Sequence, residues 1–207
     1  VFSIDPRAFW HDPYPTLKAM REQAPIAYVP ELDATLMVKR DDIALNEKLI
    51  DVFSSVQPGG LMTQLMGQNM MRKDGRDHRA ERKAIFPAIS PKTVKAVWRA
   101  AFEDMTDRAL DDLAPRKGAD MTSDIARRLA GEALCLVTGL TNMDWQTMDR
   151  VSQAMVDGCA NYAGDPAIEA HCLTCVETID QHVAERLDAV RHSPDFSLLS
   201  VQQQSGM

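Results

Sequence analysis

The sequence lacks the segments that would carry a chain into or across a membrane. No apolar run approaches the roughly 20 residues that a helix needs to span a bilayer. The opening stretch, VFSIDPRAFWHDPYP, shows no basic segment followed by an apolar core, so a signal peptide is not expected here. The four cysteines are compatible with a cytoplasmic protein, because cytoplasmic thiols usually stay reduced. We therefore expect a cytoplasmic protein with no membrane partner.

The motifs of self-contained active sites are also absent. The chain has no G-x-G-x-x-G, no phosphate-binding P-loop, no G-x-S-x-G and no H-E-x-x-H. A formal net charge of -7 and a pI near 5.2 disfavour a nucleic-acid partner, because phosphate binding needs a net basic surface that releases counterions. The composition, with 45% hydrophobic and 26% charged residues, is that of a globular protein. The length of 207 residues is enough for one large domain or two small ones.

Helix breakers and periodic apolar residues predict a mainly α chain with one short β-hairpin near its N-terminus. Asp12 and Pro13 can start a first helix, which ends before the hairpin. Two β-prone runs at 26–30 and 35–40 flank the turn sequence ELDA, and a second helix is expected through 43–53. Further helices are predicted over 74–86, 92–113, 125–140, 144–162, 167–192 and 197–204.

Residues 54–71, SSVQPGGLMTQLMGQNMM, fit neither a regular helix nor a strand. Pro58 and three glycines interrupt the stretch, yet it is rich in leucine and methionine. Long loops of this kind are often functional rather than simple connections. The methionines fit two interpretations equally well: they fill gaps in a core, or they form the adaptable wall of an apolar pocket.

The strongest local charge lies in MRKDGRDHRAERKAIF, residues 71–86, which holds six basic residues and a histidine. Asp74 can cap a helix here, with Asp77 in a position like that of a capping box. His78 and Arg82 are four residues apart, so they share one face of that helix and can donate to the same anionic group. Spacing alone favours a simpler alternative, in which both are solvated residues on a charged helix.

His171, Cys172 and Cys175 resemble part of a metal site. Structural zinc needs four ligands, usually with a second pair at matching spacing, and the sequence offers no second pair. Cys172 and Cys175 are better explained as small apolar residues on the buried stripe of a helix. We therefore expect this chain to bind no metal ion through its own side chains.

The order of these elements, taken with the basic helix, resembles the N-terminal half of a bacterial cytochrome P-450. In that family a proline-flanked helix, a hairpin, a second helix and a variable apolar loop precede a helix with an acid-x-x-acid-His-x-x-x-Arg signature. Asp74, Asp77, His78 and Arg82 match this signature. Family members often read Asp-Pro-Pro-Glu-His here, so the sequence departs from them at Gly75 and the two residues after it. The strings FSS and VTGL also stand where the family has similar ones.

The resemblance, which runs from Asp12 to the end of the chain, implies a single incomplete domain of a haem-thiolate monooxygenase. Such an enzyme holds haem b and takes electrons from a ferredoxin-like or flavin donor. It inserts one oxygen atom from O2 into a small apolar substrate. The domain would consist of a helix, hairpin and helix at 12–53, a substrate-side loop at 54–73 and a helical part at 74–207.

The same resemblance implies roles for individual residues. His78 and Arg82 would bind a haem propionate. The apolar loop and two lid helices would line the substrate pocket, with the candidates Leu61, Leu65, Met66, Met70, Met71, Met155, Val156 and Cys159. An outward basic patch that docks an acidic electron donor would consist of Arg72, Lys73, Arg76, Arg79 and Lys83. The simpler alternative for this patch is a solvated face that offsets nearby acidic side chains.

Several parts of the family pattern are missing from this sequence. The oxygen-activating helix, the Glu-x-x-Arg pair and the Phe-x-x-Gly-x-x-x-Cys ligand loop belong to the family's C-terminal half, and none occurs here. We therefore expect no axial cysteine and no activity in the isolated chain. Two alternatives remain open. One is an all-helical ligand-binding regulator with a basic helix-turn-helix, and the other is a haem-free half-domain that acts as a binding or structural module.

Overall fold

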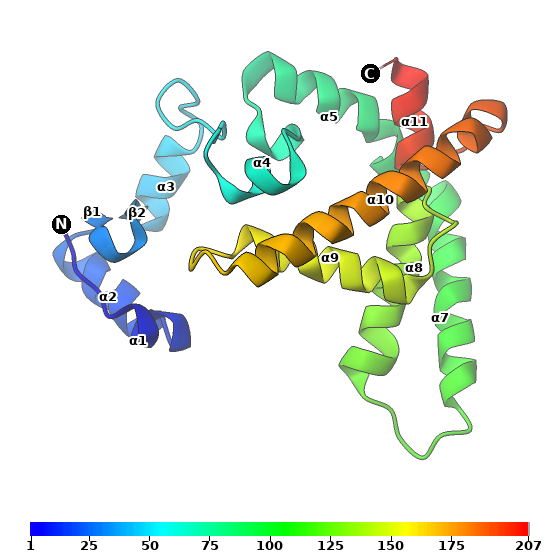
Figure 1. The fold of residues 1–207 in the computed structure, drawn as a ribbon, viewed down its shortest axis with the longest axis horizontal. Helices are drawn as coiled ribbons and strands as arrows, with labels where there is room; N and C mark the ends of the chain where they lie inside the picture. Colours follow the sequence, from blue (N-terminus) through cyan, green and yellow to red (C-terminus); the bar gives the residue numbers. More distant parts are fainter. Residues whose placement is uncertain (207) are drawn as a thin grey trace. The chain divides into compact units, whose positions relative to one another are not determined.

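The computed structural model describes residues 1–206 of the 207-residue chain. These residues form two compact units, Val1–Ser55 and the residues from Val56 onward. The first unit contains the hairpin, at the blue end of the sequence in Figure 1, and the described residues of the second unit form helices only. The prediction of a mainly α fold with one short hairpin is confirmed.

The hairpin of the first unit is a two-stranded antiparallel sheet. Strand β1 (Ile26–Val29) pairs along its whole length with β2 (Ala34–Met37). The connection is a turn of 3-10 helix, η1 (Pro30–Leu32), followed by Asp33 in the left-handed conformation with φ 46°. Aspartate tolerates this conformation better than most residues, and the Asp33 carboxylate accepts a 2.6 Å hydrogen bond from the Tyr28 hydroxyl.

One face of the hairpin covers a small apolar core. Ala27 and Val29 are two residues apart on β1, so they point to the same side of the sheet, and both are buried with Met20. Met20 comes from α2 (Tyr14–Gln23), which the sequence predicts after Pro13. Other apolar side chains complete the cluster: Phe2, Ile4, Ala24, Leu32, Leu36 and Val38.

A short helix, α1 (Pro6–His11), precedes α2 and was not predicted from the sequence. The Asp5 carboxylate caps it, accepting hydrogen bonds from the backbone N–H groups of Arg7 and Ala8 at 2.9 and 3.2 Å. Proline suits the first position of this helix, because the backbone N–H that proline lacks would have no partner within the helix there. Six residues are too few to show an apolar period, so only the cap and the proline indicate this helix.

The helix after the hairpin is shorter than predicted. Helix α3 (Arg40–Asn46) ends seven residues before the expected end at Phe53. The Asn46 side-chain amide donates a 2.8 Å hydrogen bond to the Asp42 carbonyl. Such local side-chain bonds compete with the backbone ladder of a helix. The apolar residues after α3 therefore lie in turns rather than on a helical stripe.

The second unit is an assembly of helices joined by short segments. η3 and η4 are π-helical turns that lead directly into α7 and α8. All the helices predicted for this part of the chain are present. Within the described residues the helical elements are α4 (Leu61–Met66), η2 (Met70–Arg72), α5 (Gly75–Ile89), α6 (Pro91–Thr93), η3 (Val94–Trp98), α7 (Arg99–Leu113), η4 (Met121–Ala126), α8 (Arg127–Thr138), α9 (Trp145–Cys159), α10 (Pro166–His192) and α11 (Leu198–Ser205).

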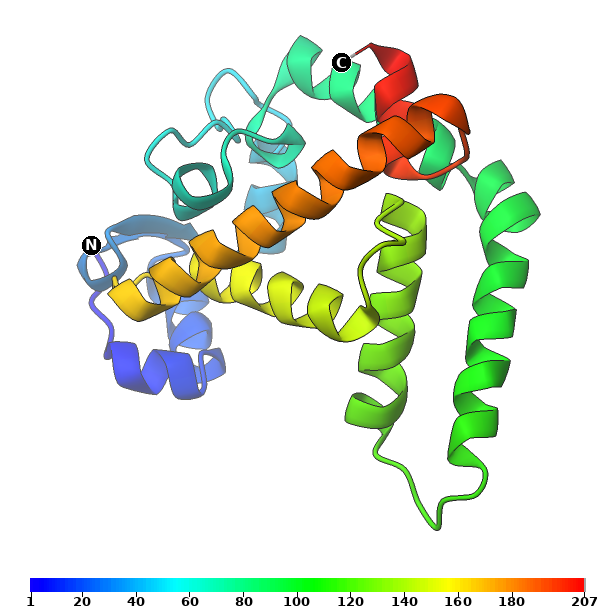
Figure 2. The same ribbon diagram turned by 45° about the vertical axis from the view of Figure 1, so that its right-hand side comes forward.

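The core of this unit lies between α8, α9 and α10. Helices α7 and α8 run antiparallel side by side, and α9 and α10 form a second pair (Figures 1 and 2). The buried cluster combines residues of α8, α9 and α10 with two from the connection between α8 and α9: Cys135, Leu140, Met143, Met148, Val151, Ala154 and Cys175. No helix within residues 1–206 has both the length and the apolar character that a membrane crossing requires.

Two glycines allow these helices to approach closely. A Cβ atom at Gly131 on α8 would lie 2.8 Å from the Trp145 carbonyl oxygen. A Cβ atom at Gly158 on α9 would lie 2.6 Å from the Cys172 sulfur on α10. Both distances are shorter than any ordinary contact of a methyl group, so a larger residue at either position would force the helices apart.

Helix α5 extends past Pro87 and ends at Ile89, three residues beyond the predicted end. Side chains from the next segment satisfy carbonyl groups at this end. The Thr93 hydroxyl donates to the Pro87 carbonyl at 2.6 Å, and the Trp98 indole N–H donates to the Ala88 carbonyl at 2.7 Å. The last carbonyls of a helix have no partner within it, so these two bonds fix how α5 meets α6 and η3.

The stretch predicted as a broken loop contains two short helical elements. Helix α4 begins after Gly60 and ends at Gly67, which has φ 72° in the region that glycine adopts readily. The 3-10 turn η2 follows three residues later. The glycines therefore limit the length of α4 rather than preventing it, and the loop assigned to 54–73 is only partly irregular.

Candidate functional site

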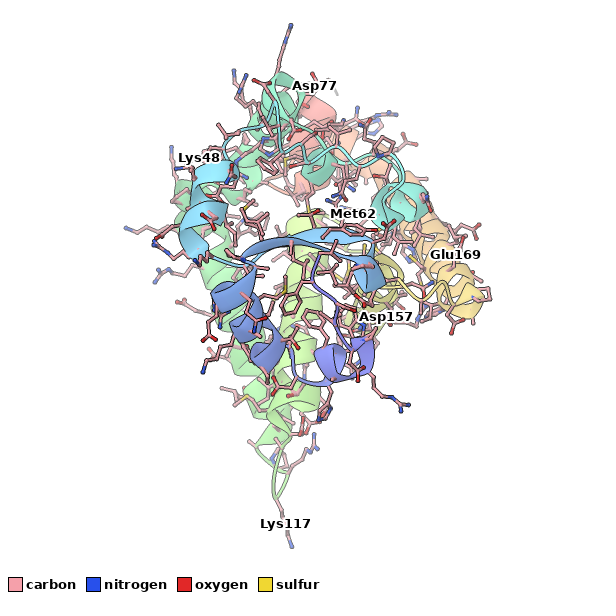
Figure 3. All side chains as sticks on the ribbon, turned by 90° about the vertical axis from the view of Figure 1, so that its left-hand side faces the viewer. Lys48, Met62, Asp77, Lys117, Asp157 and Glu169 are labelled. Carbon is pink, nitrogen blue, oxygen red and sulfur yellow. The ribbon has the colours of Figure 1, made fainter. Side chains whose placement is uncertain are left out.

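The basic helix α5 begins where the sequence predicts. Asp74 occupies the N-cap position in an extended conformation, with φ -119° and ψ 171°. Gly75 follows with φ 53°, and Asp77, labelled in Figure 3, lies in the first turn. Proline is held near φ -65°, so the Pro-Pro pair typical of the resembled family cannot adopt the Gly75 conformation. The departure from that family at Gly75 is therefore a real difference in the backbone.

His78 and Arg82 lie one helical turn apart on α5. Arg82 is exposed and His78 is half-buried. Within residues 1–206, neither side chain makes a hydrogen bond or an ion pair. An imidazole and a guanidinium with free donors on one helix face can bind a single carboxylate, and the planar guanidinium is suited to it. The pair therefore fits a haem propionate, although propionate binding itself stays a prediction.

Two members of the predicted outward basic patch do not face outward. Lys73 forms an ion pair with Glu81, and the two side chains are only 23% and 30% exposed. Arg72 is half-buried, and its Nε atom is fully buried. Both residues precede α5, in η2 and the extended link after it, so the helical wheel does not apply to them. Both side chains are therefore less exposed than an outward patch requires, and their part in partner docking stays a prediction.

The other three members of the patch do face solvent. Arg76, Arg79 and Lys83 are exposed on α5, at spacings of three and four residues. Residues at these spacings lie on one side of a helix. Within the described residues, none of the three forms an ion pair. They are a compact set of unpaired cations, and we refer to them as the α5 patch.

The substrate-pocket candidates fall on adjacent elements of the second unit. Helix α4 packs against α9 and α10, so the residues from the apolar stretch lie beside those predicted on α9. Leu61, Met66, Met70, Met155 and Cys159 are half-buried. This arrangement could form part of one apolar wall.

Three other pocket candidates have different surroundings. Leu65 is 7% exposed, and its Cδ1 atom lies 3.0 Å from the position of a Cβ atom on Gly158. Leu65 is therefore a packing residue between α4 and α9 in this structure. Met71 and Val156 are 61% and 62% exposed, so they face solvent in the described part of the chain.

The four cysteines all lie on helices of the second unit. All four are free, and burial raises the pKa of Cys135, Cys159 and Cys172. Cys172 and Cys175 are both fully buried, which confirms their prediction as small apolar residues on a helix stripe. Across residues 1–206 no group of three or more His, Cys, Asp or Glu side chains could hold a metal ion.

A cavity of about 460 Å³ lies beside α9 and was not predicted from the sequence. Arg127 donates to the Asp149 carboxylate at its edge, and this bond lowers the pKa of Asp149. Arg150 and His171, which also line the cavity, lie within 3.7 and 3.9 Å of the Cys175 sulfur. Arg127 and Asp149 pair with each other, and the lining carries both signs of charge, so the cavity does not present one sign of charge to a ligand.

Comparisons with known proteins agree with the resemblance seen in the sequence. No model of a known protein family matches the chain. Pulcherriminic acid synthase of Bacillus subtilis is 19% identical over 205 residues, which cover 97% of this chain and 50% of that protein. Cytochrome P-450 130 of Mycobacterium tuberculosis is 24% identical over 169 residues, covering 75% of this chain and 41% of its own length.

Solved structures give the same result at the level of the fold. Cytochrome P-450 BioI, solved with an acyl carrier protein ligated to hexadec-9Z-enoic acid, superposes with a TM-score of 0.79 at 15% identity. The match covers 96% of this chain and 56% of that one. CalO2 superposes with a TM-score of 0.75 at 18% identity, covering 100% of this chain and 54% of its own.

These matches define the class: the described residues have the fold of a cytochrome P-450. The chain corresponds to the N-terminal half of such a protein, and it spans about half the length of the curated relatives it matches. The resemblance drawn from Asp74, Asp77, His78 and Arg82 and from the order of elements is thus confirmed.

Proposed function

We propose that the chain is part of a haem-thiolate monooxygenase that inserts one oxygen atom from O2 into a small apolar substrate. The observation that carries this proposal is the His78–Arg82 pair, whose donors have no partner within residues 1–206, in a chain with the P-450 fold. Haem b, when bound, supplies the oxygen chemistry, and the protein binds, orients and shields the reactants around it.

His78 and Arg82 would hold one haem propionate from the N-terminal half of the protein. The Arg82 guanidinium donates to the carboxylate through charge-assisted hydrogen bonds, and the His78 ring adds a donor one turn earlier on α5. Their position on a helix of 15 residues fixes the direction of both side chains. A rigid helix of this kind would anchor the cofactor more firmly than a loop.

The half-buried residues of α4, η2 and α9 would cover the substrate. Met66 and Met70 are flexible and polarizable, so they can adapt to apolar molecules of different shape. The short α4 is held against α9 by Leu65, which gives this cover one fixed point. The residues around that point remain free to adjust to a ligand.

The α5 patch would dock the electron donor, a ferredoxin-like or flavin protein with an acidic surface. The patch stands on the same helix as the proposed propionate site, and all three of its side chains are exposed. In a chain with a net charge of -7, a local cluster of cations steers an acidic partner to one place. Helix α5 would therefore serve the cofactor and the partner at once.

Carbon monoxide binding to the reduced complete protein tests this proposal. We expect the Soret band of a thiolate-ligated haem in the protein expressed from the full reading frame. The 207-residue chain alone should give no such band, because its sequence lacks the Phe-x-x-Gly-x-x-x-Cys ligand loop of the family. A complete protein without the thiolate-type Soret band would refute the proposal.

A further inference from the structure

Arg72, at the end of η2, is the residue of this region that the proposed function leaves unexplained. Its side chain is half-buried, and within residues 1–206 its Nε atom is fully buried without a hydrogen-bond partner. Burying a donor without a partner costs stability, and native proteins rarely leave one unsatisfied. Arginine also stays protonated under all ordinary conditions, so the missing partner is an acceptor.

The adjacent residue shows that a protein carboxylate can satisfy a cation in this segment. Lys73 pairs with Glu81 of α5. Within the described residues, Arg72 has no such ion pair, although it is the next residue in the chain. Arg72 therefore differs from its neighbour in lacking a carboxylate partner among these residues.

The charge of Arg72 acts on one residue of α9. Burial raises the pKa of the Cys159 thiol, and the positive charge of Arg72 lowers it, so the guanidinium is within electrostatic reach of that sulfur. Cys159 is the last residue of α9. The cation therefore stands beside the half-buried residues of the proposed substrate cover.

A second polar atom without a partner occurs in the same stretch. The Thr63 hydroxyl on α4 is buried and, within residues 1–206, makes no hydrogen bond. Thr63 is half-buried between Leu61 and Leu65 along the sequence, on the helix that packs against α9. One short segment thus holds a cationic donor and a hydroxyl, both lacking acceptors, among apolar side chains.

We propose that Arg72 determines specificity by binding a carboxylate on an otherwise apolar substrate, with the Thr63 hydroxyl as a second donor. This inference rests on the proposed function and narrows its substrate class from small apolar molecules to apolar carboxylates. The apolar body of the substrate would lie along α4 and α9. Its carboxylate would supply the acceptor that Arg72 lacks.

A haem propionate carries the same chemical group as such a substrate. The two sources of a carboxylate differ in what the loss of Arg72 would change. Loss of a propionate contact lowers haem retention for every ligand, whereas loss of a substrate contact lowers the affinity for acids only. An ester of the same acid separates the two cases, because it keeps the apolar chain and removes the charge.

The test uses the complete holoenzyme with dodecanoate and methyl dodecanoate as probes. Affinities are measured by isothermal titration calorimetry, with the ligand-induced Soret change as a second readout. We expect the wild-type protein to bind the acid more tightly than the ester. Arg72→Gln should lower the preference for the acid by roughly tenfold or more, the range of a charge-assisted hydrogen bond. Haem content should not change.

Two further variants allow the inference to be tested if Arg72→Gln folds poorly. Arg72→Lys keeps the charge and should retain part of the preference, while Thr63→Val should reduce acid binding by roughly twofold to tenfold as a neutral hydrogen bond is lost. Arg21→Gln is the matched control, because Arg21 is exposed on α2. It should leave the preference at the wild-type value.

Three results would overturn the inference. The first is that the wild-type protein binds acid and ester with equal affinity, and the second is that it shows no measurable binding of the acid. The third is that Arg72→Gln loses haem but keeps the preference for the acid. The last would assign the cation to a propionate. None of them removes the thiolate-type Soret band with carbon monoxide, so failure of this inference is distinguishable from failure of the proposed function.

Discussion

Gly158 on α9 stands directly against the sulfur of Cys172 on α10. A Cβ atom at Gly158 would lie 2.6 Å from this sulfur and 2.9 Å from the Cys172 Cβ atom. It would also lie 3.0 Å from the Leu65 side chain of α4. One glycine thus sets the spacing of α9 against both α10 and α4. We expect its substitution to have consequences far beyond one methyl group.

Gly158→Ala should destabilise the protein in spite of the higher helix propensity of alanine. Propensity favours alanine by about 1 kcal/mol, and overpacking of a filled core costs about 1–3 kcal/mol. Because the contact involves the Cys172 Cβ atom as well as its sulfur, we expect the overpacking to dominate. Urea unfolding of the complete protein measures the change.

The double variant Gly158→Ala/Cys172→Ala tests the stated cause. Removing the sulfur makes room for the new methyl group, so part of the lost stability should return. Gly118→Ala is the control, because no atom lies within 4 Å of a Cβ atom at Gly118. An unchanged midpoint for Gly158→Ala would show that α9 and α10 adjust freely.

Trp98→Phe should destabilise the junction between α5 and α7. The Trp98 indole N–H donates to the Ala88 carbonyl at 2.7 Å, and both residues are buried. Phenylalanine keeps most of the apolar contact but leaves this carbonyl without the donor, at a cost of about 1–3 kcal/mol. Thermal unfolding should show a lower midpoint, whereas Trp10→Phe, at a 63% exposed position, should not. Equal midpoints for the two variants would contradict this role.

The Arg127–Asp149 pair should make a small, pH-dependent contribution to stability. The hydrogen bond from Arg127 lowers the pKa of Asp149 in the folded protein. The contribution of the pair to stability is therefore fully present above the ordinary aspartate pKa of about 4. It is lost as the pH falls through the lowered pKa that Asp149 has in the folded protein. Asp149→Asn should lower stability at neutral pH and match the wild type in acid.

Asp188→Asn is the control for this pH dependence. Asp188 pairs with Arg191, but its side chain is 84% exposed, so solvent screens the interaction. We expect no difference from the wild type at either pH. An Asp149→Asn deficit that persists unchanged into acid would mean that packing, rather than charge, stabilises this contact.

Arg79→Glu should slow electron delivery to the complete enzyme. The substitution reverses one charge of the α5 patch, so it weakens the attraction of an acidic donor and the salt dependence of the rate. Haem content should stay the same. Stopped-flow reduction by a ferredoxin at several salt concentrations measures both effects, with Arg7→Glu on the exposed surface of α1 as the control. An unchanged rate would remove the patch from partner docking.

The basic stretch shows how far the sequence could be interpreted without a structure. The position of Asp74 at the N-cap of α5 and the shared face of His78 and Arg82 were predicted from the sequence, and the structure has both. The direction of Arg72 and Lys73 did not follow, because these residues lie before the helix and their surroundings come from α9 and Glu81. Periodicity predicts orientation only within a regular element.

Short helices were also hard to predict from the sequence. Long helices such as α9 and α10 bury several residues at regular spacing, and their periods predict them well. Helices α1 and α4 have six residues each, so capping and neighbouring elements determine them. The closeness of Leu65 to Gly158 could not be predicted either, because it depends on how α4 packs against α9.

Haem release from the complete enzyme tests the central claim, that His78 and Arg82 hold a propionate. The rate of haem transfer to excess apomyoglobin should rise roughly tenfold or more in Arg82→Ala, the range of one charge-assisted hydrogen bond, and should also rise in His78→Ala. Arg79→Ala, in the α5 patch of the same helix, should release haem at the wild-type rate. Wild-type release from Arg82→Ala, or equal acceleration in all three variants, would contradict the account.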